Sequence, residues 1–497
     1  MTPPASAPAV PALAAGSADR YASISRAAHI ARRASFAATA SLTAEIAAMT
    51  PNAWIDAQLN PSAIPDAACD AMLAEEFPWL ALTSKQISDV TGRKSHKAAT
   101  LLPRATIARR LLTKRHLLEV VVDVLTSHIY VPVLEAQFVI DFDREVTRKY
   151  ALGRYSDYLQ KALRHPAVLA FLDNASSTKV KPNENLGREL LELFTVGTGN
   201  YTEDDVLASA KLLTGHSYSY ASMTYQYVAA NHYVGPLKIM GFTTANGTAA
   251  GGPAVLTAYL NYLARHPATA KRLCRRLAVR FVSDTPSEAL VNSLVKVYLS
   301  NGTSIKAVVR ALLRHPEFLA SAGLKWRTPQ EWLTAMYAAA QAPYTPVFDY
   351  TVNPYAVMKL VTNTLNTCGA APRGWPTVDG YKDIASAWTT TVSLQQAWQC
   401  AETCAWGLDP DFVSAPWAST LGVAEGQNVW TAATSITRQL TGFVWPTEQL
   451  SAIASMLASA GTVASPPTET LLDATMIQNH LPETVRLVLA SPAFMTR

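Results

Sequence analysis

The chain has 497 residues, 49% of them hydrophobic, so it can bury an extensive core and is not disordered as a whole. Only 16% of the residues are charged, and the net charge of +5 is small and scattered, which argues against nucleic-acid binding. No run of about eighteen apolar residues occurs, which argues against a transmembrane segment.

Residues 1–20 are rich in Pro, Ala and Ser, and we expect them to form a flexible tail. They lack the basic start and the leucine-rich centre of a signal peptide. The low charge of the rest of the chain suits a surface of neutral polar groups. We therefore expect a secreted or periplasmic protein whose signal peptide is absent from this chain.

Helical periodicity dominates the chain up to residue 216. Residues 21–59 alternate helix-forming runs with capping Ser and Thr, and Pro51 can begin a helix. Leu and Val recur at helical spacing over residues 103–132, which predicts a core helix. The tripeptide Arg-His-Pro occurs at residues 164–166, 265–267 and 314–316, where proline favours the start of a new helix.

The segment 183–216 contains an acidic amphipathic helix. On a helical wheel its apolar side holds Leu186, Leu190, Leu193 and Phe194, with Leu191 at the border. Its polar side holds Glu184, Asn185, Arg188, Glu189 and Glu192. If this side lines a cleft, burial raises the pKa of one carboxyl while Arg188 keeps another ionised, which suits glycoside hydrolysis. The alternative is a solvated surface held by salt bridges. Thr202 and Asp205 begin the next helix as a capping box.

Other polar residues can converge on the same face. They are Asp141, Asp143 and Arg144, then His216, His232 and Lys238, and the aromatic Trp375 can stack on a sugar ring. Carboxylates such as Asp141 or Asp143 can also bind a divalent cation through oxygen. Motifs for nucleotide binding, serine hydrolysis and zinc proteolysis are missing, and we expect no cofactor. Cys368, Cys400 and Cys404 leave open a disulfide, a metal pair or packed thiols.

Residues 217–242 are rich in Tyr, Ser, Thr and Val with near-alternation, which predicts a small β-hairpin insertion. Residues 343–389 contain several Pro, Asn and Gly and are expected to form long loops. Helical signals return before and after these loops. The predicted fold is mainly α, a single large and irregular helical domain over residues 21–497.

The segment NENLGRELLELFTVGTGNYTEDDVLASAKLLTGH resembles the hallmark of the bacterial domain-of-unknown-function 1800 family. The likeness extends upstream through DFDREVTRKYALGRYSDYLQKALRHPAVLAFLDNA and downstream through HYVGPLKIMG, ALLRHPEFLA and GWP. It implies a largely helical fold, frequent export and a sulfatase-like partner family. His216 stands where tryptophan is usual, and Lys238 lies one place after the usual lysine, so the chain resembles a divergent member.

Our leading hypothesis is an exported glycoside hydrolase that acts on a bacterial or environmental polysaccharide by carboxylate acid/base catalysis. The candidate catalytic residues are Glu184, Glu189, Glu192, Asp141 and Asp143. The candidate substrate-binding residues are Arg144, Asn185, Arg188, His128, His216, His232, Lys238 and Trp375. The alternatives are a non-catalytic export or assembly factor that binds a sulfatase-like partner, and a metal-dependent hydrolase.

Overall fold

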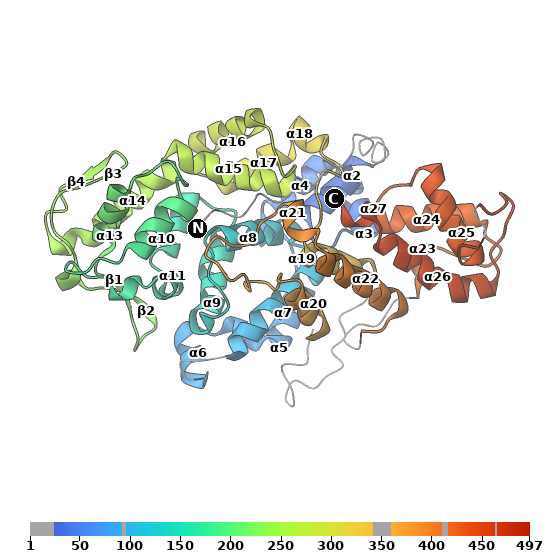
Figure 1. Ribbon diagram of the computed structural model, residues 1–497, viewed down its shortest axis with the longest axis horizontal. Coiled ribbons are helices and arrows are strands. Elements are labelled where there is room, and N and C mark those ends of the chain that lie inside the picture. The colour runs from blue at the N-terminus through green and yellow to red at the C-terminus, as the bar shows by residue number, and fades with distance from the viewer. Residues whose placement is uncertain (1–23, 92–95, 341–358, 410–415, 463–464) are drawn as a thin grey trace, which may run out of the picture.

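The computed structural model describes residues 24–91, 96–340, 359–409, 416–462 and 465–497. The fold is mainly α, as predicted, and the molecule is elongated, with small sheets at one end and the C-terminal helices at the other (Figure 1). None of the described helices is long and apolar enough to cross a membrane. The tail predicted for residues 1–20 lies outside the described residues.

The described residues of the first part of the chain fold into eight helices, of which α7 is the longest. These are α2 (Arg26–Ala34), α3 (Ala40–Met49), α4 (Pro51–Gln58), α5 (Ala67–Glu76), α6 (Ser84–Thr91), α7 (His96–Leu112), α8 (His116–His128) and α9 (Ala136–Phe142). Pro51 is the first residue of α4, as predicted from its preset backbone angle. The short 3₁₀ turns η1 (Pro61–Ala63) and η2 (Pro78–Ala81) lie between them.

The middle of the chain contains the acidic helix and the β insertion. Its helical elements are η3 (Asp143–Arg148), α10 (Tyr155–Ala162), α11 (Pro166–Phe171), η4 (Asn174–Ser176), α12 (Glu184–Glu189), η5 (Leu190–Phe194) and α13 (Glu203–Leu213). Thr202 caps α13 in a capping box with Asp205, as predicted.

The predicted β insertion is present as two small hairpins. β1 (His216–Ser219) pairs with β2 (Thr224–Tyr227), and β3 (Leu237–Ile239) pairs with β4 (Phe242–Thr244), both antiparallel. Between them, Gly235 has a φ of +143° and is followed by Pro236, which has no backbone N–H to donate to a ladder. The single predicted hairpin is therefore divided in two.

The two short turns η6 (Ala229–Asn231) and η7 (Ala249–Gly251) flank the second hairpin, and the described chain after them forms helices joined by loops. Its helices up to residue 340 are α14 (Gly252–Arg265), α15 (Pro267–Phe281), α16 (Glu288–Ser300), α17 (Ile305–Leu313), α18 (Pro316–Leu319) and α19 (Pro329–Ala339). The later ones are α20 (Lys359–Thr367), α21 (Ala385–Trp388), α22 (Thr391–Trp406), α23 (Trp417–Leu421), α24 (Val429–Thr441), α25 (Thr447–Ser459), α26 (Ala474–Leu489) and α27 (Pro492–Met495). Within the predicted loops of 343–389, residues 343–358 lie outside the described residues, and α20 and α21 occupy part of the rest.

The three Arg-His-Pro tripeptides are helix corners, as predicted. In each, the histidine ring caps the following helix by accepting a hydrogen bond from the backbone N–H two residues later. The Nδ1 atoms of His165, His266 and His315 lie 3.1, 3.2 and 3.2 Å from those nitrogens. The proline then occupies the first helical position, where its missing N–H costs nothing.

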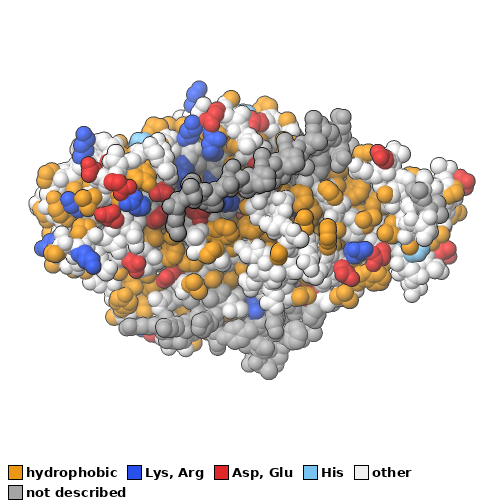
Figure 2. All heavy atoms as spheres, viewed as in Figure 1, with side chains coloured by type: hydrophobic (Ala, Val, Ile, Leu, Met, Phe, Trp, Pro, Cys, Tyr) orange, Lys and Arg blue, Asp and Glu red, His pale blue; other side chains and the backbone are white. Residues whose placement is uncertain are grey.

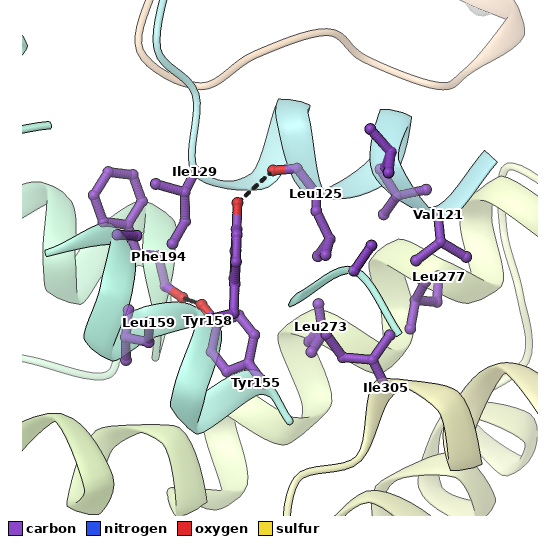
Figure 3. Close-up of a cluster of buried hydrophobic side chains, with 14 of the residues drawn as sticks. Val121, Leu125, Ile129, Tyr155, Tyr158, Leu159, Phe194, Leu273, Leu277 and Ile305 are labelled. Atoms are coloured by element: carbon purple, nitrogen blue, oxygen red, sulfur yellow. Dashed lines mark hydrogen bonds between the residues drawn. The ribbon is translucent and has the colours of Figure 1, made fainter. Parts of the chain in front are cut away.

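The buried apolar residues form two clusters, and the larger one supports the candidate site. In it, Val121 and Leu125 of α8 pack near Leu273 and Leu277 of α15 (Figure 3). The hydroxyl of Tyr158 donates to the Leu125 carbonyl at 3.1 Å and closes the cluster from α10. Because one face of α8 and one face of α15 are fixed in this core, their other faces are held at a set separation.

All five cysteines are free, and Cys400 and Cys404 are buried.

Candidate functional site

The acidic helix begins as α12 and continues as a single π-helical stretch, η5. Asn183 caps it by accepting a hydrogen bond from the Asn185 N–H at 3.0 Å. A π turn adds one residue per turn, so it rotates the residues that follow it. Leu191 is consequently fully buried, whereas Leu193, predicted on the apolar side, is only half-buried. π turns of this kind are frequent at functional sites.

The N-terminal half of this helix faces solvent. The Arg188 guanidinium forms a two-point ion pair with Glu203 of α13, at 2.8 and 2.6 Å. Glu184 lies 3.5 Å from the same guanidinium and is half-exposed, and Asn185 is exposed. Such surface pairs contribute only about 0–1 kcal/mol. Glu184, Asn185 and Arg188 thus form the solvated surface that was the alternative interpretation.

The C-terminal half differs, because Glu189 and Glu192 are partly buried. Burial raises the pKa of Glu189, and the negative charges of Glu192 and Asp379 raise it further, against the opposing effect of Arg188. Glu192 accepts hydrogen bonds from the Tyr201 hydroxyl at 2.5 Å and from the Thr198 hydroxyl at 3.4 Å. In the described part of the chain, the Glu189 carboxyl has no hydrogen bond or ion pair of its own. Two neighbouring carboxyls therefore have different environments.

Asp143 lies in a buried ion-pair chain away from this helix. Its carboxylate accepts from Arg148 at 2.8 Å and from Arg373 at 2.9 Å, and Arg148 also forms a two-point pair with Glu119. Burial opposes ionisation of Asp143, but the charges of Arg148 and Arg373 outweigh it and hold its pKa far below the ordinary value. This network ties η3 and the 370s segment to α8.

Asp141 and Arg144 connect α9 and η3 to the turn before α6. Asp141 accepts from Arg144 and, at 3.2 Å, from the Ser84 hydroxyl. The Arg144 guanidinium also donates to the carbonyls of Leu80 and Leu82 at 2.6 and 3.0 Å. Among the described residues, neither side chain forms a hydrogen bond or ion pair with the acidic helix, and no group of three or more His, Cys, Asp or Glu is arranged to hold a metal ion.

The candidate histidines His128 and His216 are each within hydrogen-bond distance of a tyrosine hydroxyl. His128 is buried, with Nε2 at 2.9 Å from the Tyr155 hydroxyl, and burial holds its pKa far below the ordinary value. Burial, aided by the charge of Arg164, lowers the pKa of His216 to about 3, and its Nδ1 lies 2.7 Å from the Tyr225 hydroxyl.

His232 and Lys238 are the remaining two candidates in the β insertion. The ring nitrogens of His232 lie 2.8 Å from the Thr214 carbonyl and 3.0 Å from Oδ1 of Asn246, so both are occupied by the fold. Lys238 is exposed on β3. Among the described residues, neither side chain forms a hydrogen bond or ion pair with the acidic helix.

A pocket of about 320 Å³ opens between α8, α15, the start of α19 and residues 370–388. Its lining residues are Asp123, Val124, Ser127, Arg272, Arg276, Val279, Arg280, Thr328, Gln330, Ala370, Asp379, Tyr381, Lys382, Asp383, Ile384 and Trp388. Arg272, Arg276 and Arg280 follow one another at four-residue steps and share one face of α15. Figure 2 shows that the visible Lys and Arg side chains lie mostly over the half of the molecule that carries α12 to α15 and the sheets.

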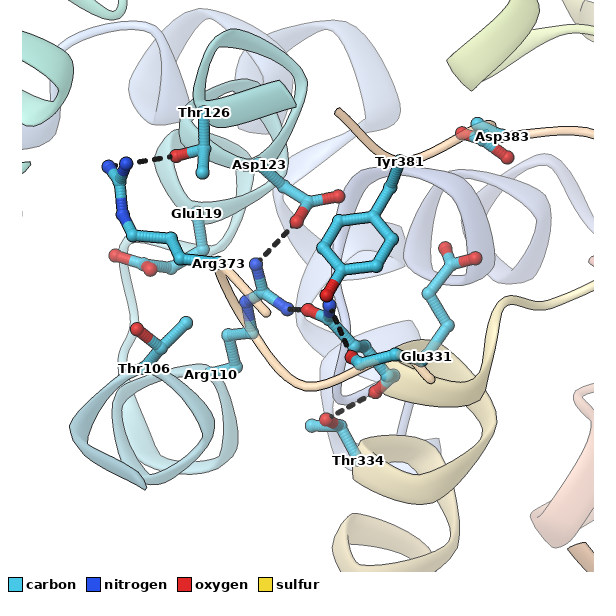
Figure 4. Close-up of polar contacts among 12 residues, drawn as sticks. Thr106, Arg110, Glu119, Asp123, Thr126, Glu331, Thr334, Arg373, Tyr381 and Asp383 are labelled. Carbon is cyan, nitrogen blue, oxygen red and sulfur yellow. Dashed lines mark hydrogen bonds and ion pairs between the residues drawn. The ribbon is translucent and has the colours of Figure 1, made fainter. Parts of the chain in front are cut away.

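The floor of this pocket is a rigid polar network (Figure 4). Arg110 donates to Asp123 at 2.6 Å and also to the side-chain oxygen of Gln330, whose Nε2 donates to the Ala370 carbonyl at 2.8 Å. Tyr381 stands above it and donates its hydroxyl proton to the Ala371 carbonyl. Segments far apart in the sequence are thereby fixed around one cavity.

Asp379 and Trp388 line the outer wall, and Trp375 packs against them. The Trp375 Nε1 donates to Asp379 at 3.0 Å, and the Trp375 ring lies 5.2 Å from Tyr381 and 6.2 Å from Trp388. Burial opposes ionisation of Asp379, but hydrogen bonds from Thr377 and Trp375 lower its pKa. Trp375, a predicted substrate-binding residue, therefore positions this carboxylate and belongs to the same aromatic cluster.

The acidic helix and the pocket meet at this wall. The Arg272 Nε donates to the Leu193 carbonyl at 2.9 Å, which ties α15 to the end of η5. Glu189 is close enough to Asp379 for the two charges to repel, although it is not itself part of the lining. A second hollow, of about 530 Å³, lies among α22, α25, α26 and α27, but its walls are mostly apolar, and its lining residue Arg486 pairs with Glu483 outside the lining. The chemistry-bearing groups are at the first pocket.

Gly380 holds the pocket loop against α8. Its φ is +66°, and a Cβ there would lie 2.8 Å from the Ser127 Cα and closer still to the Ser127 carbonyl. We expect Gly380→Ala to destabilise the protein by about 2–4 kcal/mol, because it adds a backbone collision to the positive-φ cost of about 1–2 kcal/mol. Gly369→Ala is the matched control, since Gly369 has the same φ of +66° and nothing within 4 Å of a Cβ. Urea unfolding of both variants checks this, and equal losses would contradict it.

Sequence reasoning did not identify Arg272, Arg276, Asp379 and Tyr381 as site residues. A signal was available for the arginines, because Arg272, Arg276 and Arg280 recur at four-residue steps and so share one face of a helix. For Asp379 and Tyr381 the signal was weak, since their role depends on a loop that contacts α8 and α15 only in the folded chain.

Comparison with known proteins identifies a family but no individual relative. A family described as a protein of unknown function (DUF1800) matches residues 29–496, nearly the whole chain. No curated protein and no solved structure matches the chain significantly.

Proposed function

This chain belongs to the DUF1800 family, and we propose that it hydrolyses glycosidic bonds, with a substrate site formed by the pocket between α8, α15 and residues 370–388 together with the adjoining Glu189 of the acidic helix. The observation that carries the proposal is a pair of neighbouring carboxyls with opposite pKa shifts, Glu189 raised and Asp379 lowered. Pairs whose environments separate their pKa values are how enzymes assign an acid and a base at one pH.

The two carboxyls have distinct roles in the proposed reaction. Glu189, whose pKa is raised by burial, serves as the acid and donates a proton to the oxygen of the leaving sugar as the glycosidic C–O bond breaks. Asp379, ionised, either attacks the anomeric carbon or removes a proton from the attacking water. Glu192 does not contact the bond in this scheme, and its negative charge raises the pKa of Glu189.

The lining of the pocket supports a sugar ligand. Trp388 and Tyr381 present aromatic surface, with ring centroids 5.9 Å apart, and the Trp388 Nε1 is held by the Lys382 carbonyl at 2.6 Å. A flat aromatic surface beside a few fixed polar groups is the usual composition of a small-ligand site.

The pH dependence of the activity tests these roles. We expect kcat/KM for a cleaved glycan to be bell-shaped, lost as pH falls through the pKa of Asp379 and lost as pH rises through the pKa of Glu189. Glu192→Gln removes a negative charge that raises the pKa of Glu189, so the alkaline limb moves to lower pH. A panel of neutral and anionic glycans provides the assay. An alkaline limb that stays in place in Glu192→Gln would refute the assignment of Glu189.

A further inference from the structure

The pocket wall carries two arginines without an acidic partner. Of the three on this face of α15, only Arg280 forms ion pairs, with Glu331 at 2.5 Å and Asp383 at 3.5 Å. In the described part of the chain, Arg272 and Arg276 form none. Their contacts are with backbone carbonyls, Arg272 with Leu193 at 2.9 Å and Arg276 with Ser127 at 2.6 Å.

The acidic residues that line the same pocket already have ion-pair or hydrogen-bond partners. Asp123 pairs with Arg110 at 2.6 Å, and Asp383 pairs with Lys325 and Arg497, each at 3.0 Å. Asp379 accepts its hydrogen bonds from Trp375 and Thr377. The positive charge of Arg272 and Arg276 is therefore not neutralised by a direct contact within the pocket.

Holding these two positive charges close together and partly out of water costs free energy when no anion is bound. Both are half-buried, and burial together with the charge of Arg272 lowers the pKa of Arg276 to about 10. Burial likewise lowers the pKa of Arg272. Buried charges in proteins are normally paired, and guanidinium groups bind oxyanions through two parallel hydrogen bonds.

We propose that Arg272 and Arg276 bind an oxyanion, a sulfate, phosphate or carboxylate, carried by the ligand of this pocket. This inference rests on the proposed function for the rest of the ligand, which then is an anionic glycan whose ring packs on Trp388 and Tyr381. The oxyanion lies at α15, on the side of the pocket bounded by η5, with Asp379 at the outer wall.

The test is direct binding, measured without turnover. Inorganic sulfate, inorganic phosphate and glucuronate are titrated into the full chain by calorimetry at constant ionic strength, with chloride as the balancing salt. The three arms distinguish which oxyanion the site prefers. We expect saturable binding of at least one, weakened by about tenfold or more in Arg276→Gln and in Arg272→Gln.

Arg275→Gln is the matched control, because Arg275 lies on the same helix but pairs with Glu288 and does not line the pocket. It should bind as the unmodified chain does. Circular dichroism identifies any variant that has not folded, and the other arginine variant then decides. Absence of saturable binding to all three anions, or equal weakening in Arg275→Gln, overturns the inference. Anion binding without hydrolysis of any glycan would instead count against the proposed function alone.

Discussion

Glu189→Gln is expected to lower kcat on a cleaved glycan by about 10²–10⁴-fold, the usual contribution of a general acid. Glutamine has the same shape but no proton to give to the leaving oxygen. The Glu189 carboxyl has no hydrogen bond or ion pair among the described residues, so the substitution breaks no contact. The fold should therefore be retained, and the urea unfolding midpoint should match that of the unmodified chain.

Glu184→Gln provides the control for this experiment. Glu184 lies five residues earlier on the same helix, is half-exposed, and among the described residues forms an ion pair with Arg188 alone. We expect its kcat to stay within about twofold of the unmodified chain, since a surface pair contributes little. Similar losses in the two variants, or no loss in Glu189→Gln, would remove Glu189 from the catalytic role.

Glu331→Gln is expected to destabilise the protein by about 3–5 kcal/mol, the usual cost of removing one partner of a buried ion pair. Glu331 is 2% exposed, accepts a hydrogen bond from Arg280 at 2.5 Å and forms an ion pair with Arg497 at 2.8 Å. Its other oxygen accepts from the Thr328 N–H at 2.9 Å and closes the capping box of α19. A neutral amide leaves two buried guanidiniums without this charge.

Glu145→Gln is the control for Glu331, because Glu145 also has two basic partners but lies on the surface. It pairs with Arg144 at 3.0 Å and Lys149 at 3.2 Å, and 46% of its side chain is exposed. Its unfolding midpoint in urea should lie close to that of the unmodified chain. If Glu331→Gln is no less stable than Glu145→Gln, the buried network does not hold the pocket floor in place.

The features that the sequence predicted correctly depend on neighbours along the chain. The Arg-His-Pro corners, the Thr202 capping box and the amphipathic character of α12 are local, and so is the strand composition of the insertion. Leu193 packs against the larger apolar cluster, as predicted, but it is only half-buried because a π turn in η5 changes the helical period.

The candidate site was harder to predict because its parts come from distant segments. Asp143 was a candidate acid, but its pairing with Arg373 requires a contact across the fold. His128 and His216 were candidates because they are histidines, yet burial keeps their pKa values low and their rings are bonded within the core. Conversely, Asp379 gained its position only when its loop packed on Ser127 of α8.

The most direct test of the central claim is azide rescue of Asp379→Asn. Without the carboxylate, glycan turnover should fall, and added azide should restore part of it by bonding to the anomeric carbon while Glu189 protonates the departing oxygen. The account predicts a glycosyl azide product, detected by mass spectrometry, and none from Gly369→Ala, which keeps Asp379. Undiminished turnover in Asp379→Asn, or turnover lost without any azide product, would contradict it.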